Sequence, residues 1–526
     1  MSAKGQLIAA AVIAAAGTPI AVAADLSGAS RQAPAPLNCE ALLSLKIDRT
    51  TLSRTETVAA GAFKSPAAPL PGPPEDFSKL PAFCRVVGSI HPAADSDIRF
   101  ELWLPVEGWN GKFMQTGNGA AAGSIFYGSM IEPLTRGYAV ANTDAGHQWA
   151  GGDFAWAVGH PERIIDYAYR AVHEQTITGK AITSASYGRA PTKSYFVGCS
   201  TGGRQGLKEA QRYPDDYDAI IAGAPANNWA PLMSLSILIE RNLTGAEGLS
   251  VVKLPILKEA ALAQCDAIDG VTDRVITEPG KCTFDPATIG CRDNGTKQCL
   301  SASEVAAAQR IYRGVVSRTG KTLMPGTGPA SEPLWAAYAS PQFHIGTSYF
   351  RNVVVHDPNW EPASFDVDTD LPRAEKADAG AADAMDPDLR KFTTHGGKLI
   401  VYHGTTDGLI PYGNSVSYYE SVTAKLGAKK TAQSVRLYLV PGMDHCWGGE
   451  GAFVIDWLSA LENWAEKGDP PGALHSLHPP FVPGPPGLPP SPSKPFTRPA
   501  CPYPQVARYE GTGDTAAAEN FVCAAR

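Results

Sequence analysis

The sequence predicts an α/β fold, in which helices flank a largely parallel sheet, and three observations support this prediction. Short apolar segments typical of strands alternate with segments of helical periodicity before residue 226 and again after residue 384. A turn of small residues at 198–202 joins one strand directly to a helix. The middle of the chain, 227–383, lacks this alternation, and we interpret it as one large insertion into a single α/β core.

The expected elements follow in chain order. Strands are predicted where apolar or alternating runs end at polar or glycine-rich turns, at 100–104, 112–115, 138–141, 194–197, 398–402 and 436–440. Helices are predicted over 165–176, where apolar residues recur at helical spacing, and over 204–212. Residues 24 to about 80 are rich in Ala, Pro and Ser and indicate a loop-rich lead-in, whereas the Pro-dense stretch 469–505 indicates an extended surface strap.

Composition places the chain among ordinary globular proteins. Its 526 residues are 44% hydrophobic and 18% charged, and this length predicts two structural units. The formal net charge of −7, without clusters of Lys or Arg, argues against nucleic acid or an anionic membrane surface as a partner. No pattern in the chain indicates an oligomeric state.

The first 23 residues are predicted to be a secretory signal peptide. Lys4 precedes an apolar run over 7–16, and a Gly-Thr-Pro break leads to Ala21-Val22-Ala23, an A-x-A cleavage site. A membrane anchor is the alternative, but the run is short and is interrupted by proline. We therefore expect a secreted or periplasmic protein that begins at residue 24 or 25.

The ten cysteines fit an exported protein, because an even count outside the cytoplasm favours disulfides. The chain contains no C-x-x-C pair of the kind that is typical of a zinc site. Spacing alone does not fix the connectivity, although the short intervals 265/282, 291/299 and 501/523 favour local pairs.

The segment Gly198-Cys199-Ser200-Thr201-Gly202 has the G-x-S-x-G pattern of a nucleophile elbow, in which a serine occupies a sharp turn between strand and helix. Serine needs an adjacent base to act as a nucleophile. Asp407 and His445 each follow a predicted strand, and the order Ser200, Asp407, His445 is that of α/β hydrolases. We therefore predict a catalytic triad on an α/β-hydrolase core with a large inserted lid.

Two other residues compete for roles in this site. Asp444 is a rival acid, but its side chain should project away from the adjacent His445, and His403 also ends a strand but fits no role in that order. An oxyanion hole needs two N–H donors. We expect them from Thr201, which follows the nucleophile, and from Gly119 in a glycine-rich turn, with Gly117 as the alternative.

Cysteines stand directly beside the predicted nucleophile and the predicted base. Cys199 precedes Ser200, and Cys446 follows His445. If the two were bonded, their Cα atoms would lie roughly 4–7 Å apart, and Ser200 and His445 would be neighbours.

Three carboxylates, Asp266, Asp269 and Asp273, fall within eight residues of the insertion. They repel one another unless they are solvated or bridged by a hard cation such as calcium, which prefers oxygen ligands. A solvated acidic turn is the simpler interpretation, since the spacing is not that of an EF-hand. A disulfide closing this loop at Cys282 would favour an ordered ion site.

Together these motifs resemble the tannase and feruloyl esterase family over nearly the whole chain after the leader. The resemblance rests on the elbow continued through Gly203-Arg204-Gln205-Gly206, on Ala210-Gln211-Arg212-Tyr213-Pro214, on Thr143-Asp144 with Gly146-His147, on the acidic loop, on Met443-Asp444-His445-Cys446, and on Arg498-Pro499-Ala500-Cys501-Pro502-Tyr503-Pro504.

The resemblance implies details that the spacing leaves open. It implies the disulfides Cys199–Cys446, Cys39–Cys84, Cys265–Cys282, Cys291–Cys299 and Cys501–Cys523. It implies a structural calcium ion in the lid, bound by the side chains of Asp266, Asp269 and Asp273 and by the carbonyls of Val271 and Val275. It implies a small-molecule substrate, an ester of an aromatic acid.

These implications set the expected organisation and activity. We expect the core at 24–226 and 384–526, the second part carrying the Pro-rich strap, and the lid with its calcium loop at 227–383. We expect a carboxylic-ester hydrolase that acts on hydroxycinnamate (feruloyl-type) esters through an acyl-enzyme. The alternatives are a tannase or a mono(2-hydroxyethyl) terephthalate-type hydrolase and, in another class, a calcium-stabilised extracellular binding module without activity.

The chain also departs from the family pattern. Arg274 stands where the family has Gly and would be strained if the position needs a positive φ, Ala120 replaces a Gly, and Thr405-Thr406-Asp407-Gly408 replaces Trp-Ala-Asp-Pro. Six lid aromatics could stack on an aromatic acyl group or form lid core: Trp335, Tyr338, Phe343, Tyr349, Phe350 and Trp360.

Overall fold

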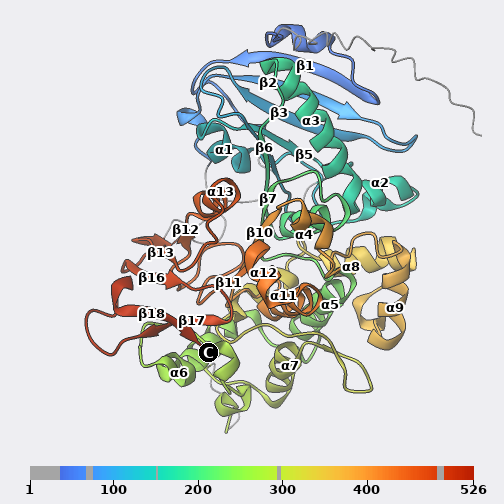
Figure 1. The fold of residues 1–526 in the computed structure, drawn as a ribbon. Coiled ribbons are helices and arrows are strands. Elements are labelled where there is room, and N and C mark those ends of the chain that lie inside the picture. Colours follow the sequence, from blue (N-terminus) through green and yellow to red (C-terminus); the bar gives the residue numbers. More distant parts are fainter. Residues whose placement is uncertain (1–35, 67–74, 150–151, 293–297, 483–490) are drawn as a thin grey trace, which may run out of the picture.

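The computed structural model describes residues 36–66, 75–149, 152–292, 298–482 and 491–526 (Figure 1). The predicted signal peptide, 1–23, lies outside the described residues, as does the part of the Pro-rich strap at 483–490. In the described ranges, no helix is both long enough and apolar enough to cross a membrane.

A twisted sheet of nine strands, counted over the described residues, forms the centre of the molecule, in the order β1-β2-β3-β5-β4-β6-β7-β10-β11. The strands are β1 (Thr50–Val58), β2 (Phe83–Ile90), β3 (Ile98–Pro105), β4 (Lys112–Thr116), β5 (Ala139–Thr143), β6 (Lys193–Cys199), β7 (Ala219–Gly223), β10 (Lys398–Gly404) and β11 (Val435–Val440). β1, β2 and β3 pair antiparallel, as do β3 and β5, and the strands from β5 to β11 are parallel. The α/β class predicted from the sequence is confirmed.

Helices cover both faces of the sheet because its strands are apolar on both sides. On β4, for example, Phe113 packs into one hydrophobic core and Met114 into the other. The first core is covered by α3 (Ala171–Tyr187), α4 (Thr201–Arg212) and α11 (Tyr412–Leu426), and the second by α1 (Ile131–Thr135) and α13 (Trp457–Lys467). The core also contains the short helices α2 (Pro161–Ile165), α10 (Arg390–Thr394) and α12 (Ala428–Ser434).

The segment between β7 and β10 is mainly helical and gathers at one side of the sheet, away from β1 (Figure 1). It contains α5 (Trp229–Thr244), α6 (Leu254–Cys265), α7 (Ala302–Arg313), α8 (Ile345–Tyr349), α9 (Val367–Ala377) and the short pair β8 (Val315–Val316) and β9 (Thr322–Met324). Its apolar side chains join the core on the α4 face, so the insertion is packed onto the sheet and not only tethered to it.

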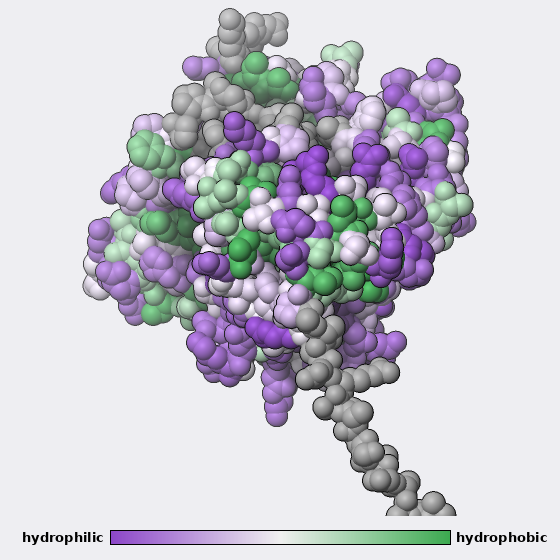
Figure 2. Space-filling model, turned by 90° about the horizontal axis from the view of Figure 1, so that it is seen from above, coloured by the Kyte–Doolittle hydropathy of each residue, from purple (hydrophilic) through white to green (hydrophobic). Residues whose placement is uncertain are grey.

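The C-terminal part forms small sheets beside β11. They comprise β12 (Val454–Ile455), β13 (Leu474–His478) and β16 (Phe496–Ala500), then β14 (Phe481–Val482) with β15 (Ser491–Pro492), and β17 (Gln505–Tyr509) with β18 (Phe521–Ala525). On the face seen in Figure 2, polar residues surround small, separate apolar groups, the mixed surface that the composition predicts.

The structure corrects one sequence expectation and refines another. The lead-in is not only loop, since it contains β1, whose sequence TTLSRTETV is too polar to resemble a strand but suits the exposed edge of a sheet. The helix expected over 165–176 begins as the short α2 and a single π-helical stretch at Asp166–Arg170 before α3 continues it.

Candidate active site

Ser200 lies on the sharp turn between the end of β6 and the start of α4. Its φ of 64° and ψ of −122° are rarely adopted by a residue with a side chain, and this strain is typical of a nucleophile elbow. The turn closes only around glycines, because a Cβ on Gly198 would lie 2.6 Å from the carbonyl carbon of Gly202. The need for small residues here, predicted from the sequence, therefore has a direct steric cause.

The other two predicted triad residues are in contact. Nδ1 of His445 lies 2.7 Å from Oδ2 of Asp407, and Ser200 and His445 line the same cavity. Nδ1–H therefore donates to the carboxylate, which leaves Nε2 as the nitrogen able to accept a proton. In the described part of the chain the Ser200 hydroxyl forms no hydrogen bond, and such contacts often tighten only when substrate binds.

Asp407 is fully buried and is held as a carboxylate. Its Oδ1 accepts hydrogen bonds from the backbone N–H groups of Leu409 (2.8 Å) and Ile410 (2.9 Å). Burial alone would raise the pKa of Asp407, but the charge of His445 and hydrogen bonds from His403 and His445 hold it well below its usual range. A stable anion at this point would favour a positive charge on the His445 imidazole.

Of the two competing residues, His403 contacts Asp407 and Asp444 contacts Thr406. Nε2 of His403 lies 3.2 Å from Oδ2 of Asp407 and 2.8 Å from the carbonyl of Ile410, so His403 contacts the predicted acid directly. The sequence signal was its place at the end of β10, four residues before Asp407. Asp444 instead accepts a hydrogen bond from Thr406 Oγ1 at 3.0 Å, and burial raises its pKa to about 6.

The glycine-rich turn after β4 is fixed to the first turns of α4. Asn118 exchanges two hydrogen bonds with the Gln205 side chain (3.0 and 2.9 Å), and its carbonyl accepts the N–H of Gly202 (2.7 Å). The N–H of Gly117 donates to Val197, which removes it as a free donor. Within the described residues the N–H of Gly119 has no acceptor, and that of Thr201 begins a helix and has none inside it.

All ten cysteines form disulfides, and the five pairs are those implied by the family resemblance: Cys39–Cys84, Cys199–Cys446, Cys265–Cys282, Cys291–Cys299 and Cys501–Cys523. The Cα atoms of Cys199 and Cys446 are 6.0 Å apart, within the range expected for bonded neighbours of Ser200 and His445. Cys446 itself has a φ of 67°, so the segment carrying His445 turns sharply at the bond.

A cavity of about 1290 Å³ opens beside Ser200 and is lined mostly by apolar and aromatic side chains. Of the six lid aromatics considered above, Tyr338 and Phe343 line it, whereas Trp335, Tyr349, Phe350 and Trp360 belong to the hydrophobic core. Sequence reasoning missed five further aromatic lining residues: Phe126, Trp229, Tyr402, Trp447 and Trp457. Trp447 alone had a sequence signal, since it follows Cys446 directly.

The acidic loop folds on itself through its own carboxylates. Asp266 accepts the N–H groups of Asp273 (3.2 Å) and Arg274 (3.0 Å), and Asp269 accepts that of Val271 (3.0 Å). The three carboxylates do not all lie within 4.8 Å of one another. However, the carbonyls of the buried Val271 and Val275 accept no backbone hydrogen bond from any described residue. The atoms of this loop that are free to bind a metal ion are thus oxygens, the ligands that calcium prefers.

Two arginines surround this loop. Arg274 has a φ of 70°, so the position does need the left-handed conformation that a glycine would adopt without strain. Its guanidinium pairs at the surface with Glu259 (2.7 Å) and Glu450 (3.1 Å), while Arg498 pairs with Asp273 (2.5 Å).

Comparison with known proteins points in one direction. The model of the family described as tannase and feruloyl esterase matches residues 84–524. The chain is 35% identical to an uncharacterised esterase of Xanthomonas campestris pv. campestris, over 96% of this chain and 94% of the relative. It is 34% identical to a probable feruloyl esterase B-2 of Aspergillus terreus, over 82% and 84%.

The solved structures agree with the sequence relatives. Feruloyl esterase B from Aspergillus oryzae is 28% identical and superposes with a TM-score of 0.82, covering 92% of this chain and 99% of that chain. The tannin acyl hydrolase from Aspergillus niger, at 23% identity and a TM-score of 0.72, shares the fold.

Proposed function

The chain belongs to the tannase and feruloyl esterase family and is a carboxylic ester hydrolase, and from this premise we propose that it hydrolyses esters of hydroxycinnamate-type aromatic acids through an acyl-enzyme on Ser200. The contact between His445 and Asp407, beside the elbow that carries Ser200, is the observation that supports this most directly.

In the proposed acylation step, Ser200 Oγ bonds to the ester carbonyl carbon and its proton passes to Nε2 of His445. The carbonyl oxygen becomes an oxyanion that accepts hydrogen bonds from the free N–H groups of Gly119 and Thr201. The bond to the alcohol oxygen then breaks, and His445 returns the proton to the leaving alcohol. Asp407 stays ionised and stabilises the charged imidazole.

In the proposed deacylation step, water replaces the serine as nucleophile. His445 takes a proton from the water, whose oxygen bonds to the acyl carbon, and the bond between that carbon and Ser200 Oγ breaks. The proton returns to Ser200, and the aromatic acid leaves.

The cavity walls support an aromatic and uncharged acyl group. Tyr338, Phe343 and Trp229 offer aromatic surface near Ser200. Among the described residues no Lys or Arg side chain lines the cavity, whereas Glu132 and Asp456 do. An anionic acyl group, such as that of a terephthalate monoester, would find no cationic partner among these lining residues.

Turnover of two methyl esters tests the proposal. Methyl ferulate should be hydrolysed with a higher kcat/KM than methyl gallate, and Ser200→Ala should lose activity on both, by at least about 10³-fold. His395→Gln, an exposed residue outside the cavity, serves as the matched control. A preference for gallate would identify a tannase, and no turnover of any ester by the wild type would favour a binding module.

We also propose that the loop 266–275 binds a structural calcium ion, through Asp266, Asp269 and Asp273 and the carbonyls of Val271 and Val275. The oxygen-only donor set and the two open carbonyls support this. Removing the ion with a chelator should lower the melting temperature, and added calcium should restore it. An unchanged melt together with no calcium by elemental analysis would contradict the proposal.

The five disulfides support a location outside the cytoplasm, since such bonds persist in oxidising compartments. We expect the mature protein to be secreted or periplasmic, with an N-terminus at residue 24 or 25, which N-terminal sequencing of the exported protein would show.

A further inference from the structure

Three side chains from separate segments converge on the far end of α4, outside the cavity that contains Ser200. They are His173 of α3, Glu209 of α4 and Asp216 of the loop that follows, and their ligand atoms all lie within 4.8 Å of one another. Over the described ranges this is the only such group of three or more His, Cys, Asp or Glu residues. We propose that His173, Glu209 and Asp216 bind a divalent transition-metal ion of the zinc class.

The buried carboxylate of Glu209 is the main observation that indicates a bound ion. Glu209 is 1% exposed, and neither of its carboxylate oxygens has a hydrogen-bond partner among the described residues. A buried carboxylate without a donor or a cation is destabilising, and such groups in native proteins usually have an ion or a water beside them. The cluster gives Glu209 no other neutralising group at bonding distance.

His173 and Asp216 form the solvent-accessible side of the cluster. Nδ1 of His173 lies 2.6 Å from Oδ2 of Asp216, and the two side chains are 21% and 13% exposed, so an ion can enter from solvent. The imidazole is fixed by stacking on Tyr213 at 3.6 Å. Ligand atoms around a tetrahedral zinc ion are spaced by about 3.3 Å, a spacing that small side-chain adjustments would reach from here.

The charges around the cluster also favour a cation. The two carboxylates would balance a divalent ion, and the C-terminal end of α4, where Glu209 lies, carries the negative end of the helix dipole. Lys180 is the nearby cation, but its ammonium donates to the backbone carbonyl of Asp216. Asp218 is paired elsewhere, with Lys193 at 2.9 Å.

The ligand types select the class of metal. One imidazole with two carboxylates suits zinc or a neighbouring transition metal better than calcium or magnesium, which prefer oxygen alone. An ion here would join α3 to α4, whose first residue follows Ser200. We therefore expect it to stabilise the elbow and not to take part in the chemistry.

Cobalt and zinc are the probes for the test, used on the full chain after chelation and in excess calcium, which is added to fill the calcium site proposed for the acidic loop. A His445→Gln background removes the imidazole at the active site as a rival ligand. We expect about one cobalt ion per chain by elemental analysis and a visible absorption spectrum typical of cobalt with a low coordination number. We also expect the melting temperature to rise by about 2 °C or more on adding zinc.

Glu209→Gln is nearly isosteric and should fold, but it should weaken cobalt binding by at least about tenfold and abolish the zinc-dependent rise. His395→Gln is the matched control, because His395 forms a similar pair with Asp215 (2.5 Å) at the exposed surface without a buried carboxylate. Equal binding by wild type and Glu209→Gln would overturn the proposal. Absence of cobalt binding by the wild type would also overturn the proposal. In that case Glu209 and Asp216 would be a carboxyl pair that shares a proton.

Discussion

At the scale of single residues, the imidazole of His147 lies inside the core, 1% exposed, with Nε2 2.8 Å from the carbonyl oxygen of Ala121. Its ring stacks on Trp156 at 3.7 Å. Burial lowers the pKa of His147 from 6.5 to about 3, so the folded protein keeps this side chain neutral at pH values where an unfolded chain would protonate it.

Stability should therefore fall as the pH drops. The folded pKa of His147 lies below the unfolded value, so its contribution is fully present above pH 6.5 and is lost toward about pH 3, by about 1.4 kcal/mol per pH unit. In His147→Gln an amide can donate to Ala121 and does not titrate. Urea unfolding should then show a decline between about pH 6.5 and pH 4.5 that is about 2 kcal/mol smaller than in the wild type.

Asp144, whose pKa burial raises to about 7, acts in the opposite direction, but it is present in both proteins and cancels in the comparison. Parallel pH dependences in wild type and His147→Gln would show that His147 does not control acid stability.

Gly117 is a second residue whose role follows from distance alone. A Cβ at this position would lie 2.5 Å from Cα of Gly202, on the opposite side of the contact between the glycine-rich turn and α4. Gly117→Ala must push this turn away from Ser200, and kcat/KM should fall by about 10²-fold or more. Gly280→Ala, where a Cβ meets nothing within 4 Å, is the control for steady-state kinetics, and unchanged kinetics in both variants would refute this reasoning.

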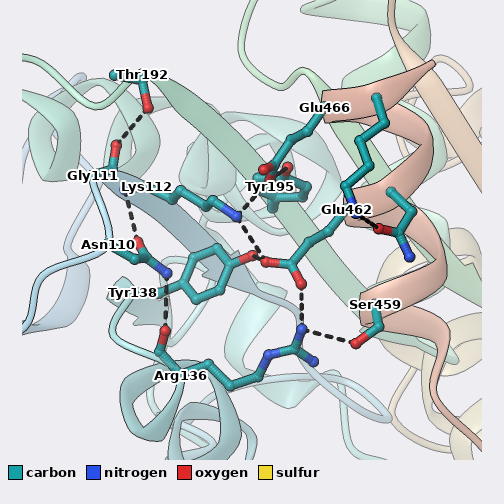
Figure 3. Close-up of polar contacts among 12 residues, drawn as sticks. Asn110, Gly111, Lys112, Arg136, Tyr138, Thr192, Tyr195, Ser459, Glu462 and Glu466 are labelled. Carbon is teal, nitrogen blue, oxygen red and sulfur yellow. Dashed lines mark hydrogen bonds and ion pairs between the residues drawn. The ribbon is translucent and has the colours of Figure 1, made fainter.

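At the scale of elements, α13 is held to the sheet by a polar network on its inner face (Figure 3). Glu462 accepts hydrogen bonds from Lys112 Nζ at 2.9 Å, from Arg136 and from the hydroxyl of Tyr138. Because Trp457 and Leu458, at the start of this helix, line the cavity, the network also fixes part of the cavity wall.

Glu462→Gln should lower the free energy of unfolding by about 1–3 kcal/mol, because it leaves two partly buried cations without this carboxylate. Glu132→Gln is the matched control. Glu132 pairs with the same Arg136 at 3.3 Å, but it is 69% exposed and should cost less than about 1 kcal/mol in the same denaturant titration. Equal losses in the two variants would show that burial of Glu462 adds nothing.

The elements also show what the sequence could and could not predict. β10 and β11 were predictable because they are continuous apolar runs buried on both faces. β1 was not, since its stability comes from pairing with β2 and not from its own residues.

At the scale of the whole molecule, the same distinction applies to the site. Ser200, Asp407 and His445 could be proposed from a local motif and from chain order. The cavity walls could not, because Phe126, Trp229 and Trp457 lie on three distant segments and meet only through packing. The disulfide partners likewise needed a family pattern, since ten cysteines allow many pairings.

The Cys199–Cys446 bond joins the two halves of the core across the inserted helices, over 247 residues of sequence. In the chain-entropy model, loss of so long a cross-link lowers stability by ~5 kcal/mol, against ~3 kcal/mol for Cys501–Cys523, which spans 22 residues. Cys199→Ala with Cys446→Ala should therefore be the less stable double variant in thermal unfolding.

Activity separates positioning from stability. Measured well below both melting temperatures, the Cys199/Cys446 double alanine variant should lose kcat/KM by about tenfold or more, because the turn at Cys446 that carries His445 is no longer tied to the residue before Ser200. The Cys501/Cys523 variant should keep its activity, since that bond lies outside the cavity lining. Full turnover by the first variant while it is folded would mean that the Asp407 contact and the sheet alone hold His445 in place.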